Sequence, residues 1–210
     1  MDVTRPASRP PVLCIDNFLP DDDAQMVLQE CIDLKKVYLP ARVFDGPTAT
    51  RIDKGYRDNE VVYLDQVFRG SPDRSDILRV LKQRIWTEEC KALWHDGYHI
   101  FDIINYSTIQ EAVVSRYGDG DFYKKHRDTR RDHITYRLVT LVYYVNQVPE
   151  EFSGGELVLW HDQESVRVEP KHNRAVVFPS FVFHEVEQTK MAGDEWDQGR
   201  FSINYWIGFS

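Results

Sequence analysis

The stretch that decides the fold is Ser115–Asp128, with the sequence SRYGDGDFYKKHRD. It ends in an H-x-D step, in which one residue separates the imidazole of His126 from the carboxylate of Asp128. Side chains two apart on a β-strand point to the same face, so a strand here would bring both groups to one point. A third ligand is available further along the chain, at His184 in the segment FPSFVFHEVEQ. We therefore expect these three side chains to form a metal site.

Two histidines and one carboxylate, with coordination positions left open, are typical of the facial triad of non-haem Fe(II) oxygenases. An isolated H-x-D triplet is a weak signal for a metal site, and a lone histidine is more often a surface or core residue. The order of the segments around the triad makes the pattern more specific. An apolar strand pattern follows the H-x-D step, then a Ser-Gly-Gly turn, a second apolar strand that leads to His184, and a last strand pattern that begins at Arg200.

Five of these segments resemble the prolyl-4-hydroxylase-like branch of the Fe(II)/2-oxoglutarate-dependent dioxygenases. They are, in chain order within residues 113–208, RYGDGDFYKKHRD, LVYYVN, FSGGELVLW, RAVVFPSFVFHEV and GRFSINYW. The upstream segment YRDNEVVYLD also resembles the strand that precedes the long helix in that family. The resemblance implies a double-stranded β-helix, which is a flattened jelly-roll barrel. It also implies that His126, Asp128 and His184 are the iron ligands.

The resemblance further implies an anchor for the distal carboxylate of 2-oxoglutarate. Arg200 matches the basic residue that pairs with this carboxylate, and an arginine suits the role because its planar guanidinium binds a carboxylate bidentately. Tyr144 and Tyr117 match positions that often help to hold the same group. Ser202 lies two residues after Arg200, so both side chains would point to one face of a strand.

The segment between His184 and Arg200 is longer than is usual in this branch, which makes Lys190 the fallback for the anchor. The additional residues, 190–199, include Trp196 and several acids. They are expected to form either an extended hairpin tip or a loop that faces the substrate.

The implied reaction is a hydroxylation. The resemblance implies Fe(II), 2-oxoglutarate and O2 as cofactors and cosubstrates, with ascorbate as a further candidate. The halogenating relatives have a small residue where this chain has Asp128, so halogenation is not expected. The expected target is an unactivated C–H bond of a prolyl or other amino-acid residue in a peptide or protein, with release of succinate and CO2.

The fold class expected for the whole chain is α+β, mainly β, with a jelly-roll core and supporting N-terminal helices. One helix is predicted after Pro20, with an apolar stripe from Ala24 to Leu34, and a second over residues 75–94. Nine strand patterns then follow without intervening helices, which indicates a sandwich or barrel. They span residues 98–106, 108–116, 121–127, 136–146, 156–161, 165–169, 174–179, 183–189 and 200–208.

The first half of the chain also contains short strand patterns, at 12–18, 38–44 and 57–64, and a polar loop over 45–55. We expect a single domain over residues 1–210, because the two helices need a sheet face to cover. Residues 1–97 would then be the helix-containing support and residues 98–208 the jelly-roll core.

Composition restricts the partners. The 210 residues are 42% hydrophobic and 29% charged, which is ordinary for a globular protein. The formal net charge of −8 and the absence of a dominant basic run make nucleic acid and anionic membranes poor partners. The first residues lack a signal-peptide pattern and no apolar run reaches about 20 residues, so we expect a cytoplasmic protein without a membrane span. The three cysteines are far apart and are expected to be reduced thiols. The sequence indicates no oligomeric state.

Three alternatives stay open at this point. The first is an enzyme of the same class that acts on a free amino acid or small metabolite, since substrates vary widely on one scaffold. A long groove between residues 45–60 and 190–199 would suit a peptide, and a closed pocket would suit a metabolite. The second is a jelly-roll ligand-binding module without catalysis, which predicts that His126, Asp128 and His184 diverge in space. The third, a cupin-type metal protein, would usually supply more histidines, clustered as H-x-H.

Two aromatic residues are weaker candidates for the pocket. Tyr123 lies three residues before His126 and so would face the opposite side of the strand, unless the strand is bulged. Trp206 would either line the substrate side or fill the barrel.

Overall fold

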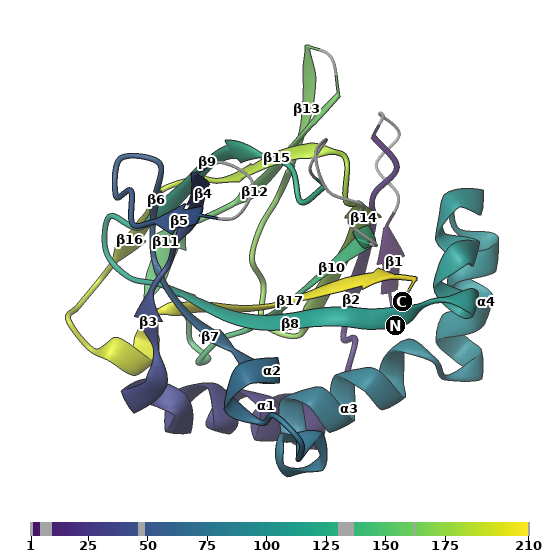
Figure 1. Ribbon diagram of the computed structural model, residues 1–210, viewed down its shortest axis with the longest axis horizontal. Helices are drawn as coiled ribbons and strands as arrows, with labels where there is room; N and C mark the ends of the chain where they lie inside the picture. The colour runs from purple at the N-terminus through teal and green to yellow at the C-terminus, as the bar shows by residue number, and fades with distance from the viewer. Residues whose placement is uncertain (1, 5–9, 46–48, 130–136, 162, 210) are drawn as a thin grey trace.

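The computed structural model describes residues 2–4, 10–45, 49–129, 137–161 and 163–209, and it places two antiparallel sheets opposite each other (Figure 1). The larger sheet has the order β1 (Asp2–Thr4), β2 (Leu13–Asp16), β14 (Arg174–Pro179), β10 (Arg137–Val145), β17 (Arg200–Gly208), β8 (Thr108–Tyr117), β7 (Glu60–Tyr63) and β3 (Leu39–Pro40). The smaller sheet has the order β13 (Glu164–Val168), β12 (Leu157–His161), β15 (Phe183–Val186), β9 (Phe122–His126) and β6 (Arg57–Asp58). Two short pairs complete the set, β11 (Phe152–Gly154) with β16 (Thr189–Met191) and β4 (Val43–Asp45) with β5 (Ala49–Arg51). The predicted mainly β fold with a jelly-roll core is confirmed.

The helices lie outside the larger sheet, below its central strands and at one end in the view of Figure 1. They are α1 (Asp21–Asp33), α2 (Leu64–Val67), α3 (Asp76–Ile85) and α4 (Glu88–Asp96), with 3₁₀ helices η1 (Leu34–Val37), η2 (Pro72–Arg74), η3 (His99–Tyr106) and η4 (Trp196–Gln198). The first turn of α1 carries three aspartates, which suit the positive end of the helix dipole. Its predicted apolar stripe is buried at Ala24, Val27, Leu28 and Cys31.

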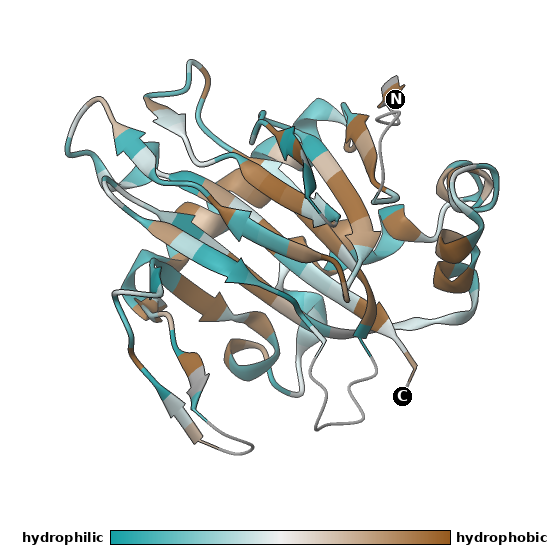
Figure 2. Cartoon of the chain, turned by 90° about the horizontal axis from the view of Figure 1, so that it is seen from above, coloured by the Kyte–Doolittle hydropathy of each residue, from teal (hydrophilic) through white to brown (hydrophobic). Residues whose placement is uncertain are grey.

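Side chains along the central strands point alternately to the two faces of the larger sheet, one covered by helices and the other facing the smaller sheet. On β17 the odd-numbered residues from Phe201 to Ile207 belong to the large apolar core that the helices cover, whereas the even-numbered ones from Arg200 to Trp206 line a pocket. Strand β10 alternates in the same way, because Leu141 and Tyr143 face the helices and Val142 and Tyr144 face the smaller sheet. Figure 2 shows hydrophobic residues gathered along the strands and hydrophilic ones on many connections. The pocket therefore lies between the two sheets.

The helix predicted over 75–94 is wrong in one respect, because it is two helices. α3 ends at Ile85, and Thr87 starts α4 by accepting a hydrogen bond from the Cys90 amide at 3.3 Å. Glu88 and Glu89 then occupy the first turn of α4. A threonine cap followed by two acids is a helix-start signal, and it lies inside the apolar pattern that suggested one helix.

The strand predicted over 98–106 is wrong, because this segment is the 3₁₀ helix η3. Its fully buried residues, Phe101 and Ile104, are three apart, which is the period of a 3₁₀ helix. The indole of Trp86 donates to the Ile104 carbonyl at 3.0 Å and ties the segment to the end of α3. The apolar composition that suggested a strand therefore serves local packing against the helices.

The remaining differences concern strand limits. The predicted strand over 183–189 is two strands, β15 and β16, and the polar loop over 45–55 contains β5. The pattern over 57–64 divides into β6 and β7 around the buried Asn59, and these two strands belong to different sheets. Within the described ranges, no helix has the length and apolarity that crossing a membrane requires.

Candidate metal centre and anion site

Three of the predicted ligands converge in the pocket between the sheets. His126 is the last residue of β9, and His184 lies directly opposite it on the neighbouring strand β15. Asp128 follows two residues after His126, and its carboxylate lies 3.9 Å from His126 Nε2 and 3.7 Å from His184 Nε2. The candidate ligand atoms of all three lie within 4.8 Å of one another. This is the convergence that the metal-site prediction requires, and the divergence expected of a binding module without a metal is not observed.

Both imidazoles are held so that the same nitrogen points inward. His126 Nδ1 lies 2.8 Å from the Lys124 carbonyl oxygen, and His184 Nδ1 lies 2.9 Å from the Val182 carbonyl oxygen. A carbonyl oxygen only accepts hydrogen bonds, so each Nδ1 carries the proton. Each Nε2 then has a free electron pair on the side that faces Asp128. Burial, and secondarily the neighbouring His184, lower the pKa of His126 well below its usual range. A neutral imidazole with a free Nε2 is the form that binds a metal.

Asp128 is held beyond the end of the strand rather than on it. Its amide donates to the Ser180 carbonyl at 3.0 Å, which continues the extended path after β9 stops at His126. One carboxylate oxygen accepts a hydrogen bond from Thr140 Oγ1 at 2.7 Å, and Thr140 also contacts the Ser180 hydroxyl at 2.9 Å. Two residues that sequence reasoning did not identify, Thr140 and Ser180, thus orient the acidic ligand.

Tyr123 lies in the pocket, because β9 is bulged. The register between β9 and β15 shifts between the pairs His184–His126 and Val186–Tyr123. Adding one residue to a strand reverses its alternation, so two side chains three apart share a face. The ring of Tyr123 stacks on His126 with centroids 3.5 Å apart. Tyr123 was expected to face away from His126 unless the strand is bulged, and the bulge places it on the same side.

Arg200 forms a second cluster in the same pocket. Its side chain is 1% exposed, its Nε donates to the Gly155 carbonyl at 2.8 Å, and its Nη1 lies 3.5 Å from Ser202 Oγ. The rings of Tyr117 and Tyr144 lie 4.6 and 5.0 Å from the guanidinium carbon. The four residues predicted to form an anchor therefore lie together. Within the described part of the chain, no carboxylate forms an ion pair with this buried cation.

The polar groups around Arg200 fit an anionic ligand. The Tyr144 hydroxyl is buried and has no hydrogen-bond partner among the described residues, and the same holds for Thr189 Oγ1. Burial raises the pKa of Tyr144 to about 12, so its hydroxyl is a protonated donor at neutral pH. Burying the Arg200 cation beside a Tyr144 hydroxyl without an acceptor costs free energy, unless a ligand carboxylate accepts hydrogen bonds from both groups. Lys190, the fallback anchor, is exposed on β16 and does not line the pocket.

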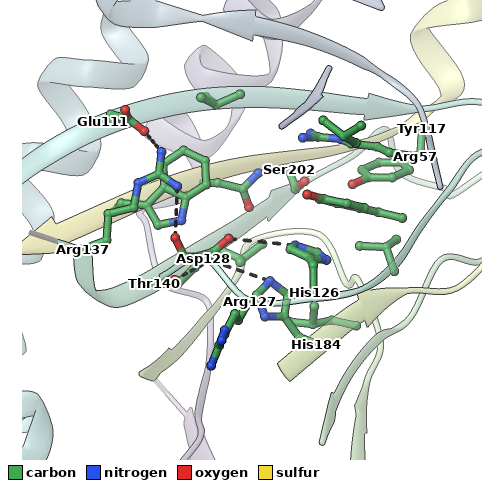
Figure 3. A pocket seen from close by; sticks show the side chains of 18 of the residues that line it. Arg57, Glu111, Tyr117, His126, Arg127, Asp128, Arg137, Thr140, His184 and Ser202 are labelled. Atoms are coloured by element: carbon green, nitrogen blue, oxygen red, sulfur yellow. Dashed lines mark hydrogen bonds and ion pairs between the residues drawn. The ribbon is translucent and has the colours of Figure 1, made fainter. Parts of the chain in front are cut away.

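The opposite wall of the pocket carries charged residues that the sequence did not single out, together with the weaker candidate Trp206. Arg137 pairs with Glu111, and its guanidinium carbon lies 3.9 Å from the ring of Trp206. Trp206 therefore lines the pocket rather than filling the barrel. Figure 3 shows Arg137 and Glu111 on one side of Asp128, with His126, Arg57 and Tyr117 on the other. Arg42 and Arg57 reach the cavity from the first half of the chain, and the cavity volume is about 310 Å³.

The additional segment 190–199 does not line this pocket. Its Trp196 packs edge-on against Tyr38 at 5.1 Å and donates its indole hydrogen to Glu60 at 3.0 Å. Arg116 donates to the Trp196 carbonyl at 2.8 Å. The segment is thus fastened to the sheet beside β7 and β8. The space between residues 45–60 and 190–199 is a hollow distinct from the metal pocket, lined by Lys54, Asp58, Asn59 and Glu60 on one side and by Met191, Gly193 and Asp194 on the other.

Comparisons with known proteins agree with this site. Residues 112–208 match the family model of the 2OG-Fe(II) oxygenase superfamily, a region that contains the three metal-site residues and Arg200. The chain is 28% identical over 203 residues to an uncharacterised PKHD-type hydroxylase of Synechocystis sp.. That alignment covers 92% of this chain and 61% of the relative, so the chain spans less than two thirds of the relative's length.

Solved structures with the same fold include several hydroxylases. A prolyl-4-hydroxylase of Pseudomonas putida has a TM-score of 0.65 and 22% identity, covering 95% of this chain and 93% of that one. A prolyl hydroxylase of Trichoplax adhaerens, in complex with a peptide fragment of the hypoxia inducible factor oxygen degradation domain, has a TM-score of 0.66 and 20% identity, with coverages of 94% and 83%. A viral collagen prolyl hydroxylase of Paramecium Bursaria Chlorella virus-1, in complex with 2-oxoglutarate, has a TM-score of 0.60 and 18% identity, with coverages of 96% and 97%.

Proposed function

We propose that the chain is an Fe(II)- and 2-oxoglutarate-dependent hydroxylase, because residues 112–208 match the family model of the 2OG-Fe(II) oxygenase superfamily. The proposed substrate is a prolyl or other amino-acid residue of a peptide or protein, and the other products are succinate and CO2. One observation carries the proposal. A single pocket holds two histidines and an aspartate with their ligand atoms within 4.8 Å, and also a buried arginine without an acidic partner among the described residues.

In this proposal, His126, Asp128 and His184 hold Fe(II). Two imidazole nitrogens and one carboxylate are the ligand set of non-haem Fe(II) oxygenases that leave further coordination positions open. The backbone carbonyls behind the two histidines keep both Nε2 atoms unprotonated and aimed inward. Thr140 keeps the carboxylate of Asp128 from rotating away.

Arg200 binds the distal carboxylate of 2-oxoglutarate in this proposal, with help from neighbouring hydroxyl groups. Its guanidinium supplies charge and a planar donor pair, and Ser202 and Tyr144 supply hydroxyl groups on the same side of the sheet. The ring of Tyr117 also lies against the guanidinium, and burial raises the pKa of Tyr117, so its hydroxyl stays protonated as well. The bound cosubstrate would accept hydrogen bonds from the donors that have no acceptor among the described residues.

When bound, iron and 2-oxoglutarate supply the O2 activation that C–H hydroxylation requires. The chain's own residues orient both groups and keep the site dry. His126 and Asp128 have side chains only 11% and 8% exposed, so few water molecules reach the ligand atoms. A shielded site of this kind limits side reactions and strengthens every electrostatic contact inside it.

The two substrate classes have different support. The similar folds of the Pseudomonas putida prolyl-4-hydroxylase and of the peptide-bound Trichoplax adhaerens enzyme favour a prolyl residue in a peptide. The cavity of about 310 Å³ lies at the lower end of the range for small-molecule sites, which favours the alternative of a free amino acid or small metabolite. Both classes belong in the first activity screen.

An anaerobic titration tests the cofactor chemistry without knowledge of the substrate. Purified protein would receive Fe(II) and then 2-oxoglutarate while the visible metal-to-ligand charge-transfer band is recorded. We expect a band in the parent protein, no band in His126→Ala, and a band that needs at least tenfold more 2-oxoglutarate in Arg200→Ala. An iron-loaded, folded protein that gives no band would contradict the proposal, and circular dichroism would establish that each variant is folded.

A further inference from the structure

The pocket carries an excess of cations on a chain that is acidic overall. The formal net charge of the chain is −8, yet only two carboxylates line the pocket among the described residues, Asp128 and Glu111. Four arginines line it in addition to Arg200: Arg42, Arg57, Arg127 and Arg137. Asp128 belongs to the metal cluster, so Glu111 is the acid that remains to balance them. The charge distribution thus predicts an anionic group in whatever molecule fills the pocket.

Three of these four arginines already have contacts that occupy them or turn them outward. Arg137 pairs with Glu111. Arg42 donates through Nε and Nη2 to the hydroxyl and carbonyl oxygens of Thr50, at 3.0 and 3.1 Å. Arg127 is exposed, and its guanidinium lies over the exposed ring of Phe183 at 5.3 Å.

Arg57 differs from the other three. It is half-buried, its Nε donates to Asn59 Oδ1 at 2.7 Å, and no described residue accepts a hydrogen bond from its two terminal nitrogens. The adjacent acid, Asp58, pairs with Lys54 instead, at 3.1 Å. These two nitrogens are not among the fully buried atoms without a partner, so water reaches them in the free protein, and a charge-assisted hydrogen bond to an anion can replace that water.

The position of Arg57 places these donors beside the metal cluster. The guanidinium carbon lies 4.3 Å from the ring centroid of Tyr123, and Tyr123 stacks on His126 at 3.5 Å. Figure 3 shows Arg57 on the same side of the cluster as Tyr117, away from Arg137 and Glu111. The ring of Tyr123 therefore lies between the Arg57 guanidinium and the imidazole of His126. Arg57 is thus too far away to contact a ligand of the metal, and it is placed to contact a group on the substrate.

We propose that the substrate carries a carboxylate close to the carbon that is hydroxylated, and that Arg57 binds this carboxylate and selects for it. The proposal rests on the proposed function and adds the substrate's chemical class to it. The carboxylate has two possible sources, an Asp or Glu side chain beside the target residue of a peptide, or the α-carboxylate of a free amino acid. Tyr123 positions Arg57 through its ring face, and Asn59 positions it through Nε.

The test compares matched acid and amide probes. One pool contains capped pentapeptides with a central proline and random flanking positions that include Asp and Glu, and the second replaces these by Asn and Gln. A third and a fourth pool contain the free L-amino acids and their α-amides. Binding to protein loaded with Zn(II) and 2-oxoglutarate is measured by saturation-transfer NMR, and succinate formation is measured with Fe(II) and O2.

We expect the parent protein to prefer one acid pool over its amide pool by about 10- to 100-fold, the range for a charge-assisted hydrogen bond to a carboxylate. Arg57→Gln should abolish this ratio and leave the concentration of 2-oxoglutarate that gives half the charge-transfer band unchanged. Arg57→Lys should retain part of the ratio, because it keeps the charge and loses the planar donor pair. The matched control is Arg51→Gln, which removes an arginine that pairs with Asp45 and Asp53 outside the pocket.

The outcomes separate this inference from the proposed function. A protein that gives no charge-transfer band contradicts the proposed function itself. A protein that gives the band and responds equally to acid and amide pools, or to neither, overturns the carboxylate inference alone. A preference for acids that persists in Arg57→Gln overturns the assignment to Arg57. The peptide and amino-acid pools tell the two carboxylate sources apart.

Discussion

The two faces of the larger sheet are built from the same strands and serve opposite purposes. Ile203 and Leu141 face the helices and are fully buried among apolar side chains. Their chain neighbours Ser202 and Thr140 face the smaller sheet, where they are also buried but contact charged groups. One face is completed by the chain itself, and the other leaves donors without partners. The difference indicates that the second face is completed by ligands.

Ile203→Ala would break the helix-facing side and is expected to have the largest effect. Removing a buried isoleucine side chain lowers the free energy of unfolding by about 2–5 kcal/mol, because a cavity remains between the sheet and the helices. The folded variant should still bind Zn(II) and 2-oxoglutarate as the parent does. Urea unfolding and isothermal titration calorimetry measure the two quantities. Equal losses in both would show that the faces are not independent.

Thr140→Val tests the pocket face without opening a cavity. It keeps the shape of the side chain and removes the hydroxyl that donates to Asp128. Loss of a partner that orients a metal ligand costs about 10- to 100-fold in metal affinity, so this is the expected drop in Zn(II) affinity. Thr50→Val is the control, because its hydroxyl contacts Arg42 away from the metal cluster. Unchanged affinity in Thr140→Val would exclude the orienting role.

Gly155→Ala tests how tightly Arg200 is packed. Gly155 has a positive φ of 69°, and an added Cβ would lie 2.6 Å from Arg200 Cδ. We expect a loss of about 1–2 kcal/mol in stability from the backbone conformation and a roughly tenfold weaker binding of 2-oxoglutarate from the displaced arginine. Gly70→Ala is a matched control, because it has a φ of 75° and no atom within 4 Å of the added Cβ. It should lose stability alone.

Ser202→Ala is expected to have the smallest effect. The hydroxyl lies 3.5 Å from Arg200 Nη1, which is a long hydrogen bond in the free protein. Its loss should weaken 2-oxoglutarate binding by about 1 kcal/mol, or roughly fivefold, and leave Zn(II) affinity unchanged. Calorimetry of both ligands measures this, and a change of Zn(II) affinity would contradict the separation of the two clusters.

Short spacing predicted that His126 and Asp128 lie together and that Arg200 and Ser202 lie together, and the structure places each pair side by side. The assignment of Arg200 to a 2-oxoglutarate carboxylate came from the family resemblance instead. The position of Tyr123 required knowledge of the bulge, which arises from pairing with β15 and leaves no local sequence signal. Arg57 was not identified for a similar reason, since its place beside the pocket depends on β6 joining β9 rather than continuing into β7.

The errors in the N-terminal half have a common cause. Apolar residues over 75–94 and 98–106 indicate burial, but burial alone does not distinguish one helix from two or a strand from a 3₁₀ helix. The break at Thr87 was marked by a cap signal that the apolar pattern outweighed. The attachment of Trp196 to Tyr38 and Glu60 could not be predicted, because these residues are far apart in the sequence and meet only in the folded sheet.

The fastening of the 190–199 segment at Trp196 has a practical consequence for work on this protein. Because Trp196 and the Arg116 contact fix the chain just before Arg200, a change in the tip ahead of them need not shift strand β17 or its pocket residues. Gly193 lies in that tip, and a Cβ placed there would meet no atom within 4 Å. A cysteine at residue 193 is therefore a suitable attachment point for a fluorophore or a surface tether. The three native cysteines are buried, so a thiol reagent would modify the new residue first.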